Sequence, residues 1–215
     1  SDYNYNRLTL ESINKWKWSK INVSSRIYAQ AANQTTPFES MAFIQGASPE
    51  TMVNDKFSRT RTFFPENTLN ATWLYQPAGS LNLRGFAGER LTEQATVEGK
   101  DTTLTTAFSA SAASWSTEID LDELIRIKAK NHMQPFHLDV YLFYDVAVLQ
   151  SNRTDRIELS KVYADAGIGS ALTIKFSPYD ITPLVIRCDM PLWLSESSSN
   201  FKAGSRIVLG INRSF

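Results

Sequence analysis

Alternating hydrophobic and polar positions dominate the chain and predict β-strands. The clearest case is residues 136–149, FHLDVYLFYDVAVL, where an apolar or aromatic residue occupies every second position from Leu138 to Val148. Successive side chains of a strand point to opposite faces, so a mixed set from His137 to Ala147 shares the other face. The pattern predicts a long strand with one apolar face and one mixed face.

The segment KWKW at residues 15–18 shows the same period and raises the question of which side is buried. Trp16 and Trp18 share one face of a strand, and Lys15 and Lys17 share the other. In a helix the two tryptophans would lie about 200° apart and form no stripe. We expect a half-buried strand with the tryptophans inside. Two alternatives stay open: exposed indoles that stack on a nucleic acid or glycan, and contact with a partner subunit.

Strand-forming residues recur along the chain, with one helix among them. Segments rich in β-branched and aromatic residues predict further strands at 59–64, 70–75, 157–167, 171–180, 183–194 and 206–211. Residues 102–115, which are rich in small and β-branched residues, suit either a strand packed closely against another sheet or a loop at a crowded subunit contact. A short helix is predicted near residues 120–129, because Asp120 and Glu123 have the spacing of a capping box and apolar residues follow at helical spacing. We predict an all-β fold: an eight- to ten-stranded antiparallel sandwich (jelly roll) in one domain over residues 1–215.

Composition and charge exclude several classes of protein. The 22 Lys and Arg residues balance 22 Asp and Glu residues, which argues against a protein whose main task is to hold nucleic acid. The one cysteine, Cys188, allows no intrachain disulfide and is expected to be a small buried hydrophobe. No apolar run approaches the ~18 residues of a membrane-spanning helix, and no signal peptide is recognised, so we expect no membrane span.

Candidate chemistry is sparse. His137, Asp139 and Asp145 share one strand face, but the further histidine or cysteine ligands of a metal centre are missing. Ser170 lacks the strand-to-helix setting of a nucleophile, and the glycines near Gly85 precede no helix that would hold a phosphate. We expect a non-enzyme with no catalytic residue, no cofactor and no metal site.

Basic and aromatic residues alternate at two places, which form the candidate assembly or ligand surface. Its residues are Lys15, Trp16, Lys17 and Trp18 in one strand and Arg59 and Arg61 in another. If these strands line the inner face of a shell, they would contact packaged nucleic acid through phosphates without reading bases. An ordinary alternating strand explains the same pattern, so both interpretations remain open.

The layout of the chain resembles the jelly-roll capsid proteins of small icosahedral viruses, including picorna-like ones. The resemblance lies in a short helix (DLDELIRIKAK), a long strand after it (FHLDVYLFYDVAVL) and a last strand near the C-terminus (SRIVLGI), with one cysteine and no catalytic set. It implies a coat subunit of the virion, cut from a polyprotein at Ser1, that assembles into a shell enclosing the genome. Its implied partners are copies of itself or sister subunits, packaged nucleic acid and a host receptor.

A binding module is the alternative function. A carbohydrate- or receptor-binding sandwich would use exposed tryptophans, such as Trp16, Trp18, Trp73 or Trp193, as a platform. The two functions make different structural predictions. A shell subunit needs broad, partly apolar contact surfaces, whereas a binding module needs an aromatic-lined groove.

Overall fold

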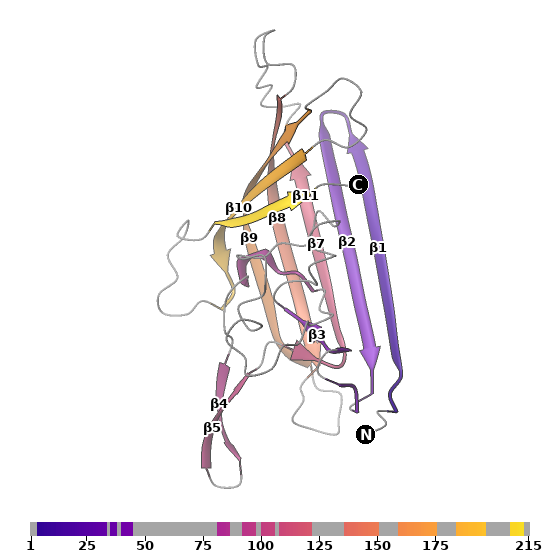
Figure 1. The fold of residues 1–215 in the computed structure, drawn as a ribbon, viewed down its shortest axis with the longest axis vertical. Helices are drawn as coiled ribbons and strands as arrows, with labels where there is room; N and C mark the ends of the chain where they lie inside the picture. Colours follow the sequence, from indigo (N-terminus) through magenta and orange to yellow (C-terminus); the bar gives the residue numbers. More distant parts are fainter. Residues whose placement is uncertain are drawn as a thin grey trace.

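The computed structural model is an antiparallel β-protein built around one seven-stranded sheet (Figure 1). It describes residues 4–33, 35–37, 40–44, 81–86, 92–97, 100–105, 108–121, 136–150, 159–175, 184–196 and 207–212. The predicted all-β class is confirmed for this part of the chain. The jelly-roll arrangement is not confirmed, because the strand order β1-β2-β7-β8-β9-β10-β11 is a meander in which sequence neighbours pair, apart from the step between β2 and β7.

The strands of the large sheet are long. They are β1 (Arg7–Trp18), β2 (Ile21–Ala32), β7 (Ala112–Asp120), β8 (Phe136–Gln150), β9 (Leu159–Ile174), β10 (Leu184–Leu194) and β11 (Val208–Asn212). Two small sheets pair β3 (Ala42–Phe43) with β6 (Phe108–Ser109) and β4 (Thr92–Val97) with β5 (Lys100–Thr105). A 3-10 turn, η2 (Arg84–Phe86), contacts β9 and β10.

Some predicted features fall outside the described residues. The helix predicted near 120–129 would begin at Asp120, which the structure places at the end of β7, and residues 122–129 are not described. Arg59, Arg61 and Trp73 also lie outside the described residues. In the part of the chain that is described, no helix has the length and hydropathy needed to cross a membrane.

The register of the strands sorts the side chains of the large sheet onto two faces, because directly opposite residues of an antiparallel pair point to the same side. One row across six strands joins Trp16, Val23, Ile119, Leu142, Ile168 and Met190. We call the face that carries this row the apolar face.

The adjacent row lies on the opposite side of the sheet, which we call the polar face. It joins Lys17, Asn22, Asp120, Tyr141, Gly169 and Asp189. This face carries all twelve Asp, Glu, Lys and Arg side chains that the structure describes in the seven strands. They are Arg7, Glu11, Lys15, Lys17, Arg26, Glu118, Asp120, Asp139, Asp145, Asp165, Arg187 and Asp189.

The core lies against the polar face. Segment 81–86 runs beside residues 42–44, where the Leu81 and Leu83 amides donate to the carbonyls of Phe43 (3.2 Å) and Ile44 (3.0 Å). Together these segments cover part of the sheet. The buried hydrophobic cluster consists of Tyr28, Ala42, Ile44, Leu81, Leu83, Phe86, Ala112, Ala147, Leu149, Tyr163 and Leu194. Over strands β2 and β7 to β10, the face that holds the charges is therefore the buried one.

The burial predicted for the KWKW segment is wrong, although its strand is confirmed. Trp16 is 54% exposed and Trp18 is 82% exposed. Strand β1 is at the edge of the sheet, and its residues are exposed on both faces over most of its length. The period of two correctly placed the tryptophans together on one face, but at this edge strand neither face is buried.

Candidate functional site

The apolar face is exposed over nearly the whole width of the sheet. Fifteen large hydrophobic side chains on it are between 37% and 82% exposed. They are Leu8, Leu10, Trp16, Trp18, Ile27, Trp115, Ile119, Phe136, Leu138, Leu142, Tyr144, Val162, Ile168, Trp193 and Leu209. Contiguous apolar surface on this scale indicates contact with another apolar phase or partner.

Aromatic residues on the apolar face lie in a band across neighbouring strands. The rings of Trp115 and Tyr144 meet edge to face with centroids 6.3 Å apart. Trp193 is opposite Ala166, which is itself opposite Tyr144. Phe136 begins β8 eight residues before Tyr144, which is about 26 Å at ~3.3 Å per residue. The outward residues of β8 between these two aromatic residues are all aliphatic.

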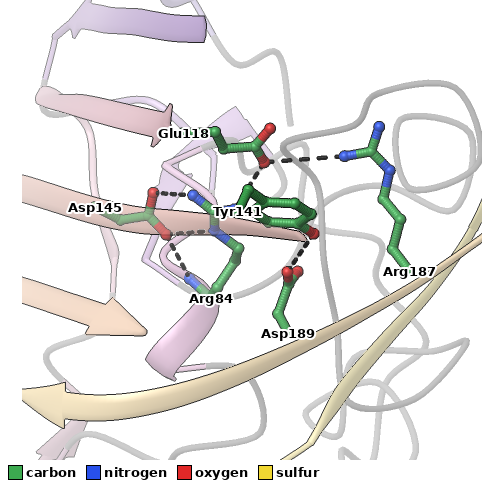
Figure 2. Close-up of polar contacts among 6 residues, drawn as sticks. All are labelled: Arg84, Glu118, Tyr141, Asp145, Arg187 and Asp189. Atoms are coloured by element: carbon green, nitrogen blue, oxygen red, sulfur yellow. Dashed lines mark hydrogen bonds and ion pairs between the residues drawn. The ribbon is translucent and has the colours of Figure 1, made fainter. Parts of the chain in front are cut away.

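The polar face contains a buried ionic cluster centred on Arg84 of η2 (Figure 2). The Arg84 side chain donates from Nε and Nη2 to the two carboxylate oxygens of Asp145, at 2.7 Å each, and from Nη1 to Oε1 of Glu118 at 2.8 Å. Its guanidinium carbon lies 4.1 Å from the ring centroid of Phe143. The geometry is a bidentate ion pair with a further carboxylate and an aromatic face.

Electrostatics hold Arg84 in its charged form. Its burial alone would lower the pKa, but the charges and hydrogen bonds of Asp145 and the charge of Glu118 raise the pKa well above its ordinary value. Arg84 and Asp145 are both fully buried. The pair therefore ties segment 81–86 to strands β7 and β8 from inside the molecule.

The cluster continues through Tyr141 toward β10. The Tyr141 hydroxyl donates to Oδ1 of Asp189 at 2.5 Å, and Nη1 of Arg187 lies 3.9 Å from Oε1 of Glu118 (Figure 2). A Cβ on Gly169, directly across from Tyr141, would overlap the tyrosine ring. Glycine at this position lets the ring lie flat over β9 and reach Asp189.

Asp165 is the carboxyl group with the least support in the cluster. It is fully buried, and its oxygens have no hydrogen bond of good geometry within the described residues. It is directly opposite Asp145 in the β8–β9 pair, and the backbone of Gly85 crosses over it so closely that a Cβ there would be 2.6 Å from Cβ of Asp165.

The residues predicted as a surface are only partly brought together. Trp16 and Trp18 belong to the apolar face, while Lys15 and Lys17 point to the polar side at the same end of β1. Arg59 and Arg61 of this predicted surface are outside the described residues.

The weak metal candidate is also not assembled as a site. His137 Nε2 lies 2.8 Å from Oδ1 of Asp139, and His137 is exposed while Asp139 is partly buried. Asp145 lies six residues further along the strand and binds Arg84 instead. Within the described ranges, no group of three or more His, Cys, Asp or Glu residues is arranged to hold a metal ion.

Cys188 lies on the apolar face rather than in the core. It is half-buried and lies opposite Leu209. The expectation of a small buried hydrophobe is therefore only partly met.

Sequence reasoning missed Arg84 and the carboxylates around it. The signal was present as charged residues on the mixed face of otherwise strand-like segments, at Glu118, Asp145, Asp165 and Asp189. The pattern by itself gives no sign that these residues are buried, because charged side chains are rarely buried unless they are paired. Their partner comes from a segment that no local pattern connects to the sheet.

Comparison with models of protein families, with curated proteins and with solved structures finds no match to this chain. The evidence for a function therefore lies in the apolar and polar faces of the large sheet. A glycan platform would need polar groups beside its tryptophans to bind sugar hydroxyls. Among the described residues, the outward positions nearest to Trp16 are Trp18, Asn14 and Val23, and of these three only Asn14 has a polar side chain.

Proposed function

We propose that the sheet is embedded in a lipid bilayer, with its apolar face against the hydrocarbon and its polar face toward a polar interior. The observation that carries the proposal is the segregation of charge. Twelve charged side chains lie on the polar face, and five of them are buried (Arg26, Glu118, Asp145, Asp165 and Asp189), whereas none of the described side chains on the apolar face of the seven strands is charged. A sheet in water has the reverse arrangement, with its apolar face packed on the core.

The dimensions of the strands support this placement. A strand tilted by about 45° crosses the hydrocarbon layer with 9–11 residues, of which every second one faces lipid. The outward residues of β8 from Phe136 to Val148 are all apolar or aromatic, and they span roughly 40 Å at ~3.3 Å per residue, or about 28 Å along the membrane normal. The expectation of no membrane span rested on the length of apolar run that a helix needs, and strands do not need such a run.

The composition of the apolar face favours lipid over a protein partner. Protein interfaces have a polar rim and about one hydrogen bond per 100–200 Å². The row from Trp16 to Met190 is apolar across six strands, and the band of Trp115, Tyr144 and Trp193 suits the boundary between hydrocarbon and headgroups.

The contacts on the polar face support its placement toward a polar interior. In a bilayer, charged groups must face an interior and be paired. On the polar face, Arg84 pairs with the carboxylates of Glu118 and Asp145, and segment 81–86 fills part of the space beside the sheet. The backbone groups at the outer edges of β1 and β11 would also need partners in lipid, so the proposal requires further strands, from the rest of the protein or from a second copy.

Flotation tests the proposal. The full protein, refolded from denaturant into vesicles, should float with them and should resist extraction at alkaline pH and in urea. The matched control is the same refolding without lipid, which should give aggregated protein because the apolar face remains in water. Recovery of a soluble, folded monomer without lipid would contradict the proposal.

A coat subunit remains the second candidate, because a partner subunit could also cover the exposed apolar face. The coat-subunit hypothesis predicts particles in the megadalton range by light scattering in detergent-free buffer. The membrane hypothesis predicts that detergent or lipid is required to keep the protein dispersed.

A further inference from the structure

A partly open cavity of about 100 Å³ lies on the polar face of the large sheet. Its lining comes from strands β2, β7, β8, β9 and β10. Four of the lining residues are charged, namely Glu118, Asp120, Asp139 and Arg187. Glu118 also belongs to the ionic cluster of Arg84, so the cavity adjoins that cluster. The proposed function gives this cavity no role.

Arg187 has fewer contacts than a largely buried cation normally makes. Its side chain is 14% exposed, and its one ion pair in the described part of the chain is a contact of 3.9 Å between Nη1 and Oε1 of Glu118 (Figure 2). Arg84 binds the same oxygen more closely, at 2.8 Å. Nε of Arg187 is buried and has no hydrogen-bond partner among the described residues. Since a guanidinium has five N–H donors and buried donors are normally paired, this side chain lacks an acceptor.

A carboxylate lies across the sheet from Arg187, with a small residue between them. Ala171 is directly opposite Asp139 in the β8–β9 pair and directly opposite Arg187 in the β9–β10 pair. With two strand spacings of ~4.8 Å, the Cα atoms of Asp139 and Arg187 are about 10 Å apart. Asp120 is diagonal to Asp139, because it is directly opposite Tyr141. The cavity therefore has a cation on one side and two carboxylates on the other.

This mixture of charges restricts the kind of ligand. A simple anion would meet Arg187 but would also be repelled by three carboxylates. A simple cation would leave Arg187 without an acceptor. Lys15 and Lys17 occur in the rows of Glu118 and Asp120, but on the edge strand, and they are not among the residues that line the cavity. A small ligand that carries both charges satisfies both sides.

We propose that this cavity binds the α-ammonium and α-carboxylate groups of an amino acid. The carboxylate accepts hydrogen bonds from the Arg187 guanidinium, and the ammonium donates to Asp139 and Asp120. Asp139 can accept while its Oδ1 remains 2.8 Å from Nε2 of His137, because a carboxylate has about four acceptor positions. The inference concerns the polar face alone and does not depend on what covers the apolar face.

The size of the cavity agrees with this ligand. A cavity of about 150 Å³ accommodates benzene, so the cavity of about 100 Å³ suits about four or five non-hydrogen atoms. That is the size of the group formed by the α-nitrogen, the α-carbon and the carboxylate. The side chain of the amino acid extends through the open side of the cavity.

Titration with ¹³C-labelled glycine, followed by NMR line width, tests the proposal on the full refolded protein, in lipid or in buffer. We expect saturable binding with a dissociation constant of about 1 mM, because the ligand is small. Acetate and methylammonium each carry one of the two charges and should bind at least about tenfold more weakly. Equal affinity for either of them, or no saturable binding of glycine up to about 100 mM, would overturn the proposal.

Two variants test the assigned residues. Arg187→Gln should weaken glycine binding by about tenfold to a hundredfold, and Asp139→Asn by about tenfold. Arg7→Gln, which removes a cation at the opposite end of β1 from the rows that line the cavity, is the matched control and should bind glycine as the parent protein does. Unchanged affinity in Arg187→Gln would contradict the assignment.

The stability of Arg187→Gln separates ligand binding from a structural role. Because Arg187 makes no close hydrogen bond to Glu118, its replacement should leave the free energy of unfolding of the ligand-free protein nearly unchanged. A large loss of stability, with glycine affinity retained, would show that Arg187 balances the charge of Glu118 and does not bind the ligand. Failure of the protein to enter vesicles would contradict the membrane proposal and leave this inference standing.

Discussion

Replacement of Arg84 with alanine is expected to lower the free energy of unfolding by about 3–5 kcal/mol. The reason is that Asp145 and Glu118 would remain buried without their cation, and the fully buried Asp145 would lose both of its 2.7 Å contacts with the Arg84 side chain. The loss should be largest around segment 81–86, because this segment is held to the sheet through Arg84. Reversible unfolding of the protein in vesicles by denaturant measures the total, and limited proteolysis reports the release of the segment.

Two control variants make this expectation specific. Arg84→Lys keeps a positive charge but cannot form the bidentate contact, so it should recover only part of the loss. Arg7→Ala removes an exposed arginine whose one described hydrogen bond, to the Ser40 carbonyl, is 3.4 Å long, and it should change stability by less than about 0.5 kcal/mol. If Arg84→Ala behaved like Arg7→Ala, the cluster would not hold the segment in place.

Replacement of Leu142 with arginine should reduce the stability of the membrane-inserted protein by about 2–4 kcal/mol. Leu142 lies in the middle of the apolar row, between Ile119 and Ile168, and is 42% exposed. In water, a charge at such an exposed position would cost little and would improve solubility. In hydrocarbon, the same charge must be brought out of water, which lowers the stability of the inserted protein. The change in stability on Leu142→Arg therefore distinguishes a face in water from a face in lipid.

The matched control is His137→Arg, which adds a cation to the polar face of the same strand, where His137 is 60% exposed. It should leave insertion nearly unchanged. Reversible unfolding from vesicles gives the free energies, and flotation gives the inserted fraction. An increase in soluble, folded protein on Leu142→Arg, with no loss of stability, would show that the apolar face does not contact lipid.

The sequence predicted which residues of a strand share a face, but not which face is buried. In FHLDVYLFYDVAVL the two sets were assigned correctly, and the structure confirms the strand as β8. The assignment of Trp16 and Trp18 to the inside failed for a physical reason. Alternation follows from backbone geometry alone, whereas burial depends on whether the surroundings are water, protein or lipid.

The ionic cluster could not be predicted from local pattern either. Arg84 lies 34 residues from Glu118 and 61 from Asp145 in the chain, and it sits in a 3-10 turn that has no strand or helix periodicity. The sequence contains Gly85 and Gly169 but does not show why glycine is needed at these positions. Gly85 allows close approach to Asp165, and Gly169 allows close approach to Tyr141. Such contacts depend on the tertiary structure, which alternation does not specify.

The environment of alternate residues along β8 tests most directly whether the apolar face lies against lipid. In a Cys188→Ser background, single spin labels at Leu138, Val140 and Leu142 are compared with labels at His137 and Asp139 in protein reconstituted into vesicles. We predict that the outward set is accessible to oxygen and protected from a water-soluble nickel chelate, with the reverse for the inward set. Accessibility of the outward labels to nickel, or to neither reagent, would contradict the account, because the apolar face would then meet water or another protein surface.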